Sequence, residues 1–276
     1  MFRGISIYYN PTAGSGSATK VWQQVRCAMD TQGIRYELLD QNHVENAAKD
    51  IIVIGGDGTF NTLLNKLKHP ENHRFILLPA GTSNSLCSQI SPKQKPLDKL
   101  ERYLTEPDFQ TIDLPQLTSN GTTYRFINEA SVGFAASIAK EIEERSTKKH
   151  FNRLNLNELA YIATAFRCWC KEEPIMLSFC NNRRISGNLF PCPNAQLNDG
   201  WIDVYDLRCS KIRLPYELTR LINAKKETLS PYINRKRVQT ASWDFDKPLP
   251  VEIDGNPIGA TDGITLSLYP YAIHVL

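Results

Sequence analysis

Three glycine-rich segments, each following a short apolar run, constrain the fold of this chain more than any other feature. The runs are the β-rich residues 5–9 and the uninterrupted apolar residues 51–54 and 75–78, and segments rich in Gly, Asn, Ser and Thr follow each of them. Uninterrupted apolar runs are typical of strands buried on both faces of a parallel sheet. Because the carboxyl ends of parallel strands meet at one edge, we expect the three segments to lie close together, where such folds bind ligands.

The fold class follows from how the strand-like runs alternate with other patterns. Helical patterns at 19–31 and 60–67 separate the first runs, whereas period-2 alternation and turn residues dominate after about residue 112. We predict an N-terminal doubly wound α/β nucleotide-binding domain over 1–112 and a β-sandwich-like domain with a few helices over 113–276. The helices expected in the second domain cover 136–144, 156–171 and 215–224.

Composition places the chain among ordinary globular proteins. It has 276 residues, of which 41% are hydrophobic and 22% charged, and its formal net charge is +3. This mild excess does not indicate a nucleic-acid partner, although it is compatible with an anionic ligand or membrane surface. No apolar run approaches the roughly 20 residues of a membrane span, and no signal peptide is recognised, so we expect a cytoplasmic protein. No motif indicates an oligomeric state.

The seven cysteines are scattered along the chain. Their odd number argues against a full disulfide framework, and there is no C-x-x-C pair of the kind that zinc sites use. We therefore expect free, buried thiols in a reducing compartment.

The residues of the glycine-rich segments favour phosphate as the ligand. Glycine lets a backbone N–H approach an anion closely, and a helix that starts after such a loop points its free N–H groups and its positive dipole end at the ligand. Any one segment alone could be an ordinary strand-to-helix turn, but three of them, one reading G-G-D-G-T, indicate a nucleotide site. The candidate nucleotide-binding residues are Asn10, Gly14, Gly16, Gly55, Gly56, Asp57, Gly58, Thr59, Asn61, Thr82 and Asn84.

Asp57 is the unusual member of this set. A carboxylate inside an anion-binding loop is costly unless it holds a cation, so we expect Asp57 to bind Mg²⁺ directly or through water. The sequence contains neither G-x-x-x-x-G-K-[ST] nor G-x-G-x-x-G followed by an acidic residue about 20 positions later. The expected site therefore differs from both standard nucleotide-binding signatures.

Six short motifs run through most of the chain in a familiar order. They lie at 10–16, 55–59, 79–84, 129–134, 194–203 and 252–255. Together they resemble the diacylglycerol kinase catalytic-domain family, which includes bacterial lipid kinases and sphingosine kinases and is distantly similar to NAD kinases. The resemblance implies an ATP- and Mg²⁺-dependent kinase that phosphorylates a hydroxyl of diacylglycerol or a related lipid in a cleft between its two domains.

The resemblance also implies a structural metal site in the second domain. Bacterial members of the family carry Mg²⁺ near an Asp-Gly turn. Carried over by position, the ion would be held by the Asp199 carboxylate and the backbone carbonyls of Gln196 and Trp201. Oxygen-only ligation suits Mg²⁺. A plain Asp-Gly hairpin turn between two strands is the alternative.

The chain departs from the family pattern at two acidic positions. Ser85 stands where the family has an aspartate of the magnesium network, and Asn256 stands where it has the glutamate regarded as the general base. Asp57 and Asp254 are the carboxylates left to compensate, so the candidate catalytic residues are Asp57, Asp254 and Asn256. A degenerate member that binds nucleotide, lipid or both with little transfer is the alternative function. A soluble acceptor, as in NAD kinases, fits the second-domain motifs less well. A further departure is the short stretch between the second and third strands, which leaves room only for a helix at 46–49.

Two surface features leave alternatives open. The apolar stripe of the expected helix at 156–171 suits either core packing or an acyl-chain pocket. Basic pairs and triplets could meet anionic lipid headgroups or could be ordinary surface charge; they lie at 148–149, 183–184, 225–226 and 235–237. The expected partners are thus a nucleotide, a lipid or lipid-like substrate and, transiently, a membrane surface.

Overall fold

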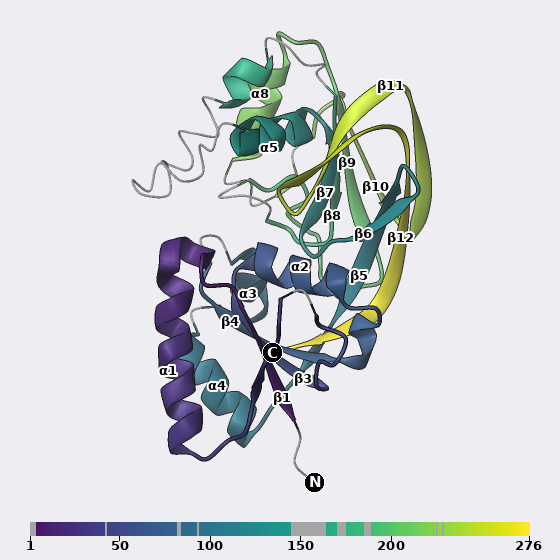
Figure 1. Cartoon of the computed structure of the whole chain (residues 1–276). Helices are drawn as coiled ribbons and strands as arrows, with labels where there is room; N and C mark the ends of the chain where they lie inside the picture. Colours follow the sequence, from purple (N-terminus) through teal and green to yellow (C-terminus); the bar gives the residue numbers. More distant parts are fainter. Residues whose placement is uncertain are drawn as a thin grey trace. The chain divides into compact units, whose positions relative to one another are not determined.

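The protein is described from a computed structural model. The described residues are 4–41, 43–81, 84–92, 94–144, 164–169, 175–184, 189–222, 224, 226–227 and 229–276. The chain divides into two compact units: unit 1 comprises Met1–Ile112 with Tyr271–Leu276, and unit 2 comprises Asp113–Pro270 (Figure 1). The division falls where the change in sequence pattern occurs. The expected second domain, 113–276, included the last six residues, whereas the structure places Tyr271–Leu276 in unit 1.

Unit 1 is built on a parallel sheet. Its strands lie in the order β12, β4, β3, β1, β2, and the central register places Ile7 beside Ile52 and Ile52 beside Ile76. The strands are β1 (Ile5–Tyr9), β2 (Glu37–Leu38), β3 (Asp50–Gly55), β4 (Arg74–Pro79) and the final residues of β12 (Asn256–Val275). Strands β3 and β4 are almost wholly buried, as their apolar runs predicted.

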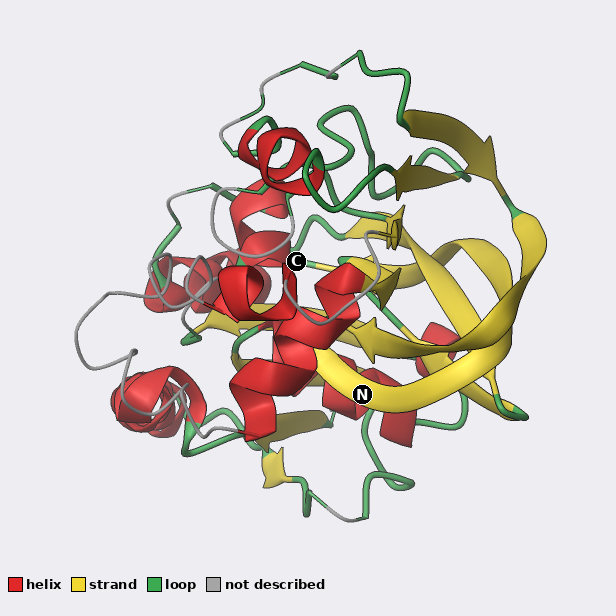
Figure 2. Cartoon of the chain, turned by 90° about the horizontal axis from the view of Figure 1, so that it is seen from above, coloured by secondary structure: helices red, strands yellow, loops and turns green. Residues whose placement is uncertain are grey.

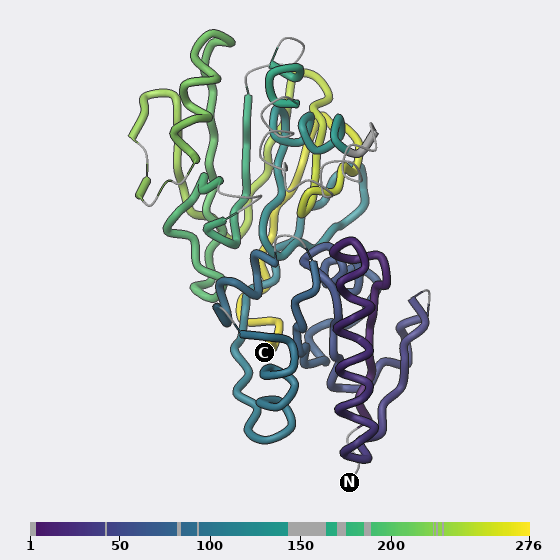
Figure 3. Tube along the Cα trace, turned by 90° about the vertical axis from the view of Figure 1, so that its left-hand side faces the viewer, coloured from purple at the N-terminus to yellow at the C-terminus, as the bar shows by residue number. Residues whose placement is uncertain are grey.

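Helices cover both faces of this sheet. The helices are α1 (Ser17–Thr31), α2 (Asp57–Lys66), α3 (Ser85–Ile90) and α4 (Pro96–Thr105), with 3₁₀ turns at Ala13–Gly16 and Pro70–Asn72. Helices α1 and α4 lie side by side (Figure 3), and their residues Met29 and Leu100 share one apolar core with Ile52. On the other face Phe60 of α2 packs edge-on against Phe75, with ring centroids 5.0 Å apart. The doubly wound α/β prediction is confirmed.

One local expectation for unit 1 was wrong, and one helix was not predicted. The described residues 43–49 form turns and contain no helix, so the expected helix at 46–49 is absent. Helix α4 was not expected, although Pro96 at its first turn is a favoured helix-starting residue. One segment is short and the other begins with a proline. In such segments tertiary packing, rather than the local sequence pattern, decides whether a helix forms.

Unit 2 is an antiparallel β structure. Its strands pair in the order β10, β9, β8, β7, β11, β12, and β5 pairs with both β12 and β6. The strands are β5 (Gln110–Ser119), β6 (Thr122–Arg125), β7 (Glu129–Gly133), β8 (Ile175–Cys180), β9 (Ile202–Arg208), β10 (Ile233–Val238), β11 (Thr240–Ile253) and β12. Figure 2 shows the long bent strands of this unit in yellow. They belong to one connected sheet rather than two separate ones.

Alternate side chains of these strands face two different cores. Phe179 and Val204 contribute to a core that also receives Leu266 from β12. Their neighbours Cys180 and Tyr205 face the opposite way and pack with apolar residues of the helices. Those helices are α5 (Phe134–Glu144), the helical residues 164–169 and α8 (Leu214–Thr219). The prediction of a β-rich domain with a few helices is confirmed; most of the expected helix at 156–171 lies outside the described residues.

The cysteines and helices bear on two further expectations. Six cysteines are described and all are free. Three of them are buried as expected (Cys168, Cys180 and Cys192), whereas Cys87 and Cys209 are half-buried and Cys27 is exposed; Cys170 lies outside the described residues. Among the residues that the structure covers, no helix is long and apolar enough to cross a membrane.

A buried ion pair joins the starts of β3 and β4. Asp50 is 1% exposed, and its two carboxylate oxygens accept hydrogen bonds of 2.6 Å from Nε and Nη2 of Arg74. The hydroxyl of Tyr103 on α4 donates a third hydrogen bond of 2.8 Å to Asp50. Removing one partner of such a pair leaves the other charge buried without compensation.

We therefore predict that Asp50→Asn lowers the free energy of unfolding by about 3 kcal/mol. The matched control is Asp108→Asn, which removes the partner of Arg102 in an exposed pair and should cost less than about 1 kcal/mol. Urea unfolding of both variants measures the difference. Equal decreases in the free energy of unfolding of the two variants would contradict the structural role given to Asp50.

Candidate functional site

The three glycine-rich loops leave the same edge of the unit 1 sheet. They follow β1, β3 and β4, which run parallel and next to one another. The loop after β1 leads into α1, the loop after β3 into α2, and the loop after β4 into α3. The expectation that these loops lie together can therefore be tested from their mutual contacts.

The loop after β1 contacts the loop after β4. Gly14 has a left-handed backbone (φ 57°), and a Cβ placed on it would lie 2.0 Å from the carbonyl oxygen of Ala80. The hydroxyl of Ser17 donates a 2.7 Å hydrogen bond to that same oxygen. Only glycine allows the first loop to approach the third this closely.

The loop after β3 contacts the loop after β4 even more closely. A Cβ on Gly81 would lie 2.4 Å from the Cα of Gly56, and one on Gly56 would lie 2.9 Å from the Cα of Gly81. Asn84 holds the third loop in shape: its side-chain amide donates to the carbonyl of Gly81 at 2.8 Å, and its Oδ1 accepts the Gly81 N–H at 3.0 Å. Thr82, another predicted nucleotide-binding residue, lies outside the described residues.

Asn10 connects the loop after β1 with the loop after β3. Its Nδ2 donates to Oγ1 of Thr59 at 3.4 Å, and its backbone N–H donates to the carbonyl of Ile54. Its Oδ1 accepts hydrogen bonds from both the backbone N–H and the hydroxyl of Thr12. Gly55 completes the contact, because a Cβ there would lie 2.4 Å from Oγ1 of Thr59. All three loops are thus in mutual contact.

Asp57 uses its carboxylate to hold α3 in place. Its oxygens accept the backbone N–H groups of Ser85 at 2.7 Å and Leu86 at 3.2 Å, which are the first two residues of α3. Asp57 is also the first residue of α2, so its negative charge lies at the positive ends of two helices. Ser85, at the position where the family has an aspartate, therefore contributes a backbone donor. The contact of Asp57 with Mg²⁺ stays a prediction.

The surface left above these contacts suits an anion. Gly58 lies in the first turn of α2, where helix geometry supplies no acceptor for a backbone N–H, whereas the N–H groups of Thr59 and Phe60 bond to the carbonyl of Gly56. A Cβ on Gly58 would meet nothing within 4 Å, and the same holds for Gly16. Asn61 is one turn further along, buried, and its Oδ1 accepts from Asn65. The open backbone at the start of α2 is the arrangement that binds phosphate in other proteins.

Asp254 has a structural role within unit 2. It lies with Gly255 in a two-residue turn between β11 and β12, and both residues have left-handed backbones. Its carboxylate accepts the backbone N–H groups of Ile127, Asn128 and Glu129 at 2.8, 2.8 and 3.1 Å. Asn256 follows at the start of β12 and is exposed.

A buried pair of glutamates lies beside this turn and was not given a role from the sequence. One carboxylate oxygen of Glu252 accepts from the Ser131 hydroxyl at 2.6 Å, and the other accepts the N–H of Gly255 at 2.5 Å. Burial raises the pKa of Glu129 well above its usual range, and the charge of Glu252 raises it further. Acidic residues inside the strand runs E-A-S-V-G and V-E-I are the sequence signal that could have revealed them.

At the predicted metal position, the carboxylate of Asp199 pairs with an arginine side chain. Oδ1 of Asp199 accepts the N–H of Trp201 at 3.1 Å, and its Oδ2 pairs with the guanidinium of Arg237. The Nε of Arg237 also lies 3.7 Å from Asp203, whose pKa burial raises to about 6. Gln196 is exposed, and no group of three His, Cys, Asp or Glu side chains that could hold a metal occurs among the described residues. As arranged, these residues do not fit Mg²⁺, because the carboxylate expected to hold it is already paired with an arginine.

Comparison with known proteins agrees with the loop geometry. Residues 5–117 match the diacylglycerol kinase catalytic domain, a stretch that contains all three loops. The resemblance found in the motifs is thus confirmed over residues 5–117 of the chain.

Relatives extend the likeness beyond the matched domain. The chain is 24% identical over 239 residues to a probable lipid kinase YegS-like protein of Stenotrophomonas maltophilia, covering 79% of this chain and 75% of that protein. It is 27% identical over 257 residues to the probable lipid kinase YegS of Escherichia coli, covering 85% and 79%. The crystal structure of a diacylglycerol kinase from Bacillus anthracis shares the fold, with a TM-score of 0.69 at 15% identity, over 99% of this chain and 96% of that one.

The open space at Gly58 yields a prediction about nucleotide binding. Gly58→Ala should leave the fold intact or slightly stabilise it, because alanine is favoured over glycine inside a helix. The added methyl group should weaken MgATP binding at least about tenfold, because it fills the space that a phosphate would occupy. Isothermal titration calorimetry measures the affinity, and thermal unfolding measures the stability.

Gly4→Ala is the control for this substitution. It adds the same methyl group in unit 1 outside the three loops, where its nearest neighbour would be Ala48 Cβ at 3.7 Å. This variant should bind MgATP as the unmodified protein does. Unchanged affinity in Gly58→Ala would show that no phosphate approaches the start of α2.

The pairing of Asp199 with Arg237 yields a prediction about metal removal. Without nucleotide, the melting temperature of the unmodified protein should be the same in MgCl₂ and in EDTA. In Arg237→Ala the carboxylate loses its cation, so MgCl₂ should raise the melting temperature relative to EDTA by about 2 °C through binding to the folded state. A magnesium-dependent melting temperature in the unmodified protein would contradict this account.

Proposed function

We propose that this protein is an ATP- and Mg²⁺-dependent lipid kinase that transfers the γ-phosphoryl group of ATP to a hydroxyl of diacylglycerol or a related lipid. The convergence of the three loops of unit 1 carries this proposal. The loops leave the first turn of α2 open at Gly58, where an added Cβ would meet nothing within 4 Å. The matching domain and the relatives named as probable lipid kinases support a lipid as the acceptor.

The chemistry asks the protein mainly to position the phosphates and to balance their charge. In this proposal the amides at the start of α2 hold the phosphates, and Mg²⁺ arrives with ATP as part of the substrate. Asp57 keeps the loops and α3 together through its two backbone hydrogen bonds, and we propose that it also contacts the Mg²⁺ directly or through water. Asn10 and Gly14 hold the first loop against the other two.

The identity of residue 256 supports the alternative function. An asparagine can accept a hydrogen bond from the lipid hydroxyl but cannot take its proton, and a general base contributes about 10²–10⁴-fold to such reactions. Asp254 is a poor substitute, because its carboxylate already accepts three backbone N–H groups. A member that binds nucleotide, lipid or both with little transfer is therefore the second candidate.

A label-transfer experiment tests both candidates. The protein is incubated with γ-labelled ATP, MgCl₂ and a panel of extracted lipids, with Gly58→Ala alongside. Label in lipid that falls in the variant supports the kinase. MgATP binding by calorimetry without label in any lipid supports the second candidate, and absence of MgATP binding overturns both.

We predict that Asn256→Glu increases the rate of transfer by about 10²-fold, because it restores a group that can accept the proton. Asn256 is exposed, so the substitution should leave stability within about 0.5 kcal/mol. Thr240→Glu, which adds the same charge at another exposed position of unit 2, serves as the control and should leave the rate unchanged. An equal rate in Asn256→Glu and the unmodified protein would show that residue 256 does not limit transfer.

A further inference from the structure

Exposed apolar side chains gather in one part of unit 2. Five of the eleven large exposed hydrophobic residues of the described chain fall between residues 212 and 232, including the two most exposed, Ile212 at 89% and Leu229 at 88%. The other three are Tyr216, Ile222 and Tyr232. These five residues are called the α8 surface below, because they lie on α8 and the segments that flank it.

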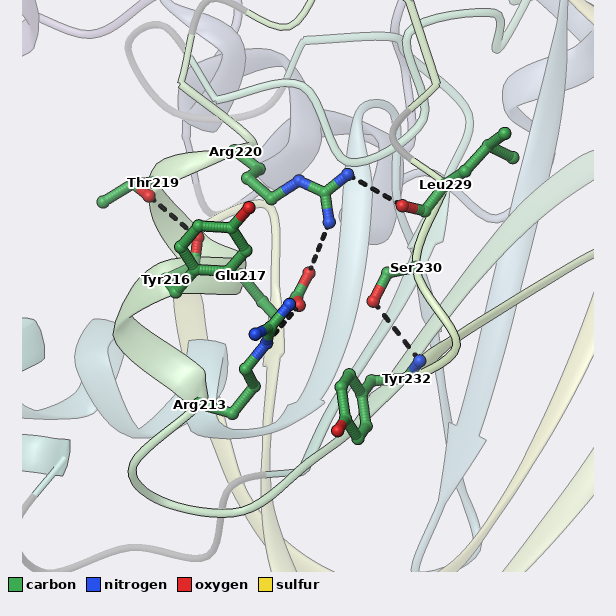
Figure 4. Close-up of polar contacts among 8 residues, drawn as sticks. All are labelled: Arg213, Tyr216, Glu217, Thr219, Arg220, Leu229, Ser230 and Tyr232. Atoms are coloured by element: carbon green, nitrogen blue, oxygen red, sulfur yellow. Dashed lines mark hydrogen bonds and ion pairs between the residues drawn. The ribbon is translucent and has the colours of Figure 1, made fainter.

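A buried carboxylate organises the α8 surface (Figure 4). Glu217 is fully buried and accepts from Nε of Arg213 at 2.9 Å and from Nη1 of Arg220 at 3.2 Å. Arg220 also donates to the backbone carbonyl of Leu229 at 2.7 Å. This hydrogen bond connects the backbone carbonyl of Leu229 to Arg220, which directly follows α8.

Arginine and tyrosine alternate across this surface. The guanidinium of Arg213 lies 4.3 Å from the ring centre of Tyr216 and 5.4 Å from that of Tyr232. Arg220 lies 5.6 Å from the ring of Tyr216. Tyrosine combines an apolar ring with a polar tip and is favoured where hydrocarbon meets water, and arginine can keep its charge at the same level.

The surroundings of the α8 surface are cationic. Residues 208–232 contain six Lys and Arg but only two Glu, whereas the whole chain has a net charge of only +3. One of the two glutamates is the buried Glu217, which is already paired with both arginines. Arg208 is also paired, with Asp206. An excess of positive charge remains when Asp206 is counted, and this excess complements anionic lipid headgroups and would make two copies of this face repel each other.

We propose that the α8 surface docks on an anionic lipid bilayer, with Ile212 and Leu229 entering the interface and the basic residues contacting the headgroups. Single apolar side chains separated by arginines suit a bilayer interface, where each chain is buried separately. The proposal rests on the proposed function, since it names where the kinase meets a lipid substrate. It assigns the docking role to residues outside the nucleotide loops.

Vesicle flotation tests the proposal without any catalytic readout. The unmodified protein should float with vesicles of phosphatidylcholine and phosphatidylglycerol and much less with phosphatidylcholine alone. Ile212→Ser combined with Leu229→Ser should reduce partitioning onto the anionic vesicles at least about tenfold, because both side chains are exposed and their loss costs the core nothing. Lys211→Glu combined with Lys226→Glu should reduce it as well and weaken its dependence on salt.

The matched control removes two equally large apolar groups elsewhere. Leu38→Ser combined with Tyr269→Ser changes residues that are 52% and 55% exposed, and it should float as the unmodified protein does. Equal flotation of all variants, or no flotation of the unmodified protein, overturns the proposal. A dimer in sedimentation velocity that the Ile212 and Leu229 substitutions dissociate would identify a second copy as the occupant and overturn it too.

A further measurement separates this proposal from the proposed function. Label transfer to a lipid dispersed in detergent does not require docking on a bilayer, so the Ile212 and Leu229 variant should keep its activity there and lose it on vesicles. Flotation without any label transfer would leave docking supported and contradict the kinase. Label transfer in detergent together with equal flotation of all variants would support the kinase and contradict docking through the α8 surface.

Discussion

The close approach of two backbones, at Gly56 and Gly81, is the constraint on which the arrangement of the three glycine-rich loops depends. Strands β3 and β4 are parallel neighbours, so the loops that follow them start side by side. A side chain on either glycine would force these loops apart. Only while they touch can the carboxylate of Asp57 reach the start of α3, and only then do three separate turns form one surface.

Three aspartates in this protein serve as acceptors for backbone N–H groups. Asp57 accepts two of them, Asp254 accepts three, and Asp113 accepts the N–H of Gly200 beside the Asp199 turn. Hydrogen bonds to the charged form stabilise a carboxylate without any metal ion. The two backbone donors of Asp57 therefore stabilise its charge within a loop that the sequence predicts to bind an anion.

The parts of the fold that could be predicted depend on neighbouring residues. The apolar runs of β3 and β4 indicate buried parallel strands, and the topology of such sheets then places their loops at one edge. The partners of Asp57 and Asp254 could not be predicted, because they lie 28 and more than 120 residues away along the chain. The same holds for Arg237, which takes the place at Asp199 that the motif assigned to a metal. A motif indicates which residue types contact a ligand. It does not indicate which side chains from distant parts of the sequence bond to those residues in the folded protein.

The path of β12 has a consequence for how the protein is made. Residues 113–270 are inserted within unit 1, whose sheet includes the end of β12 beside β4. During synthesis β12 cannot pair with the edge of β4 until the whole of unit 2 has left the ribosome. An unpaired strand edge is a template for wrong pairing with other chains. That edge of β4 therefore stays exposed for as long as unit 2 is being translated.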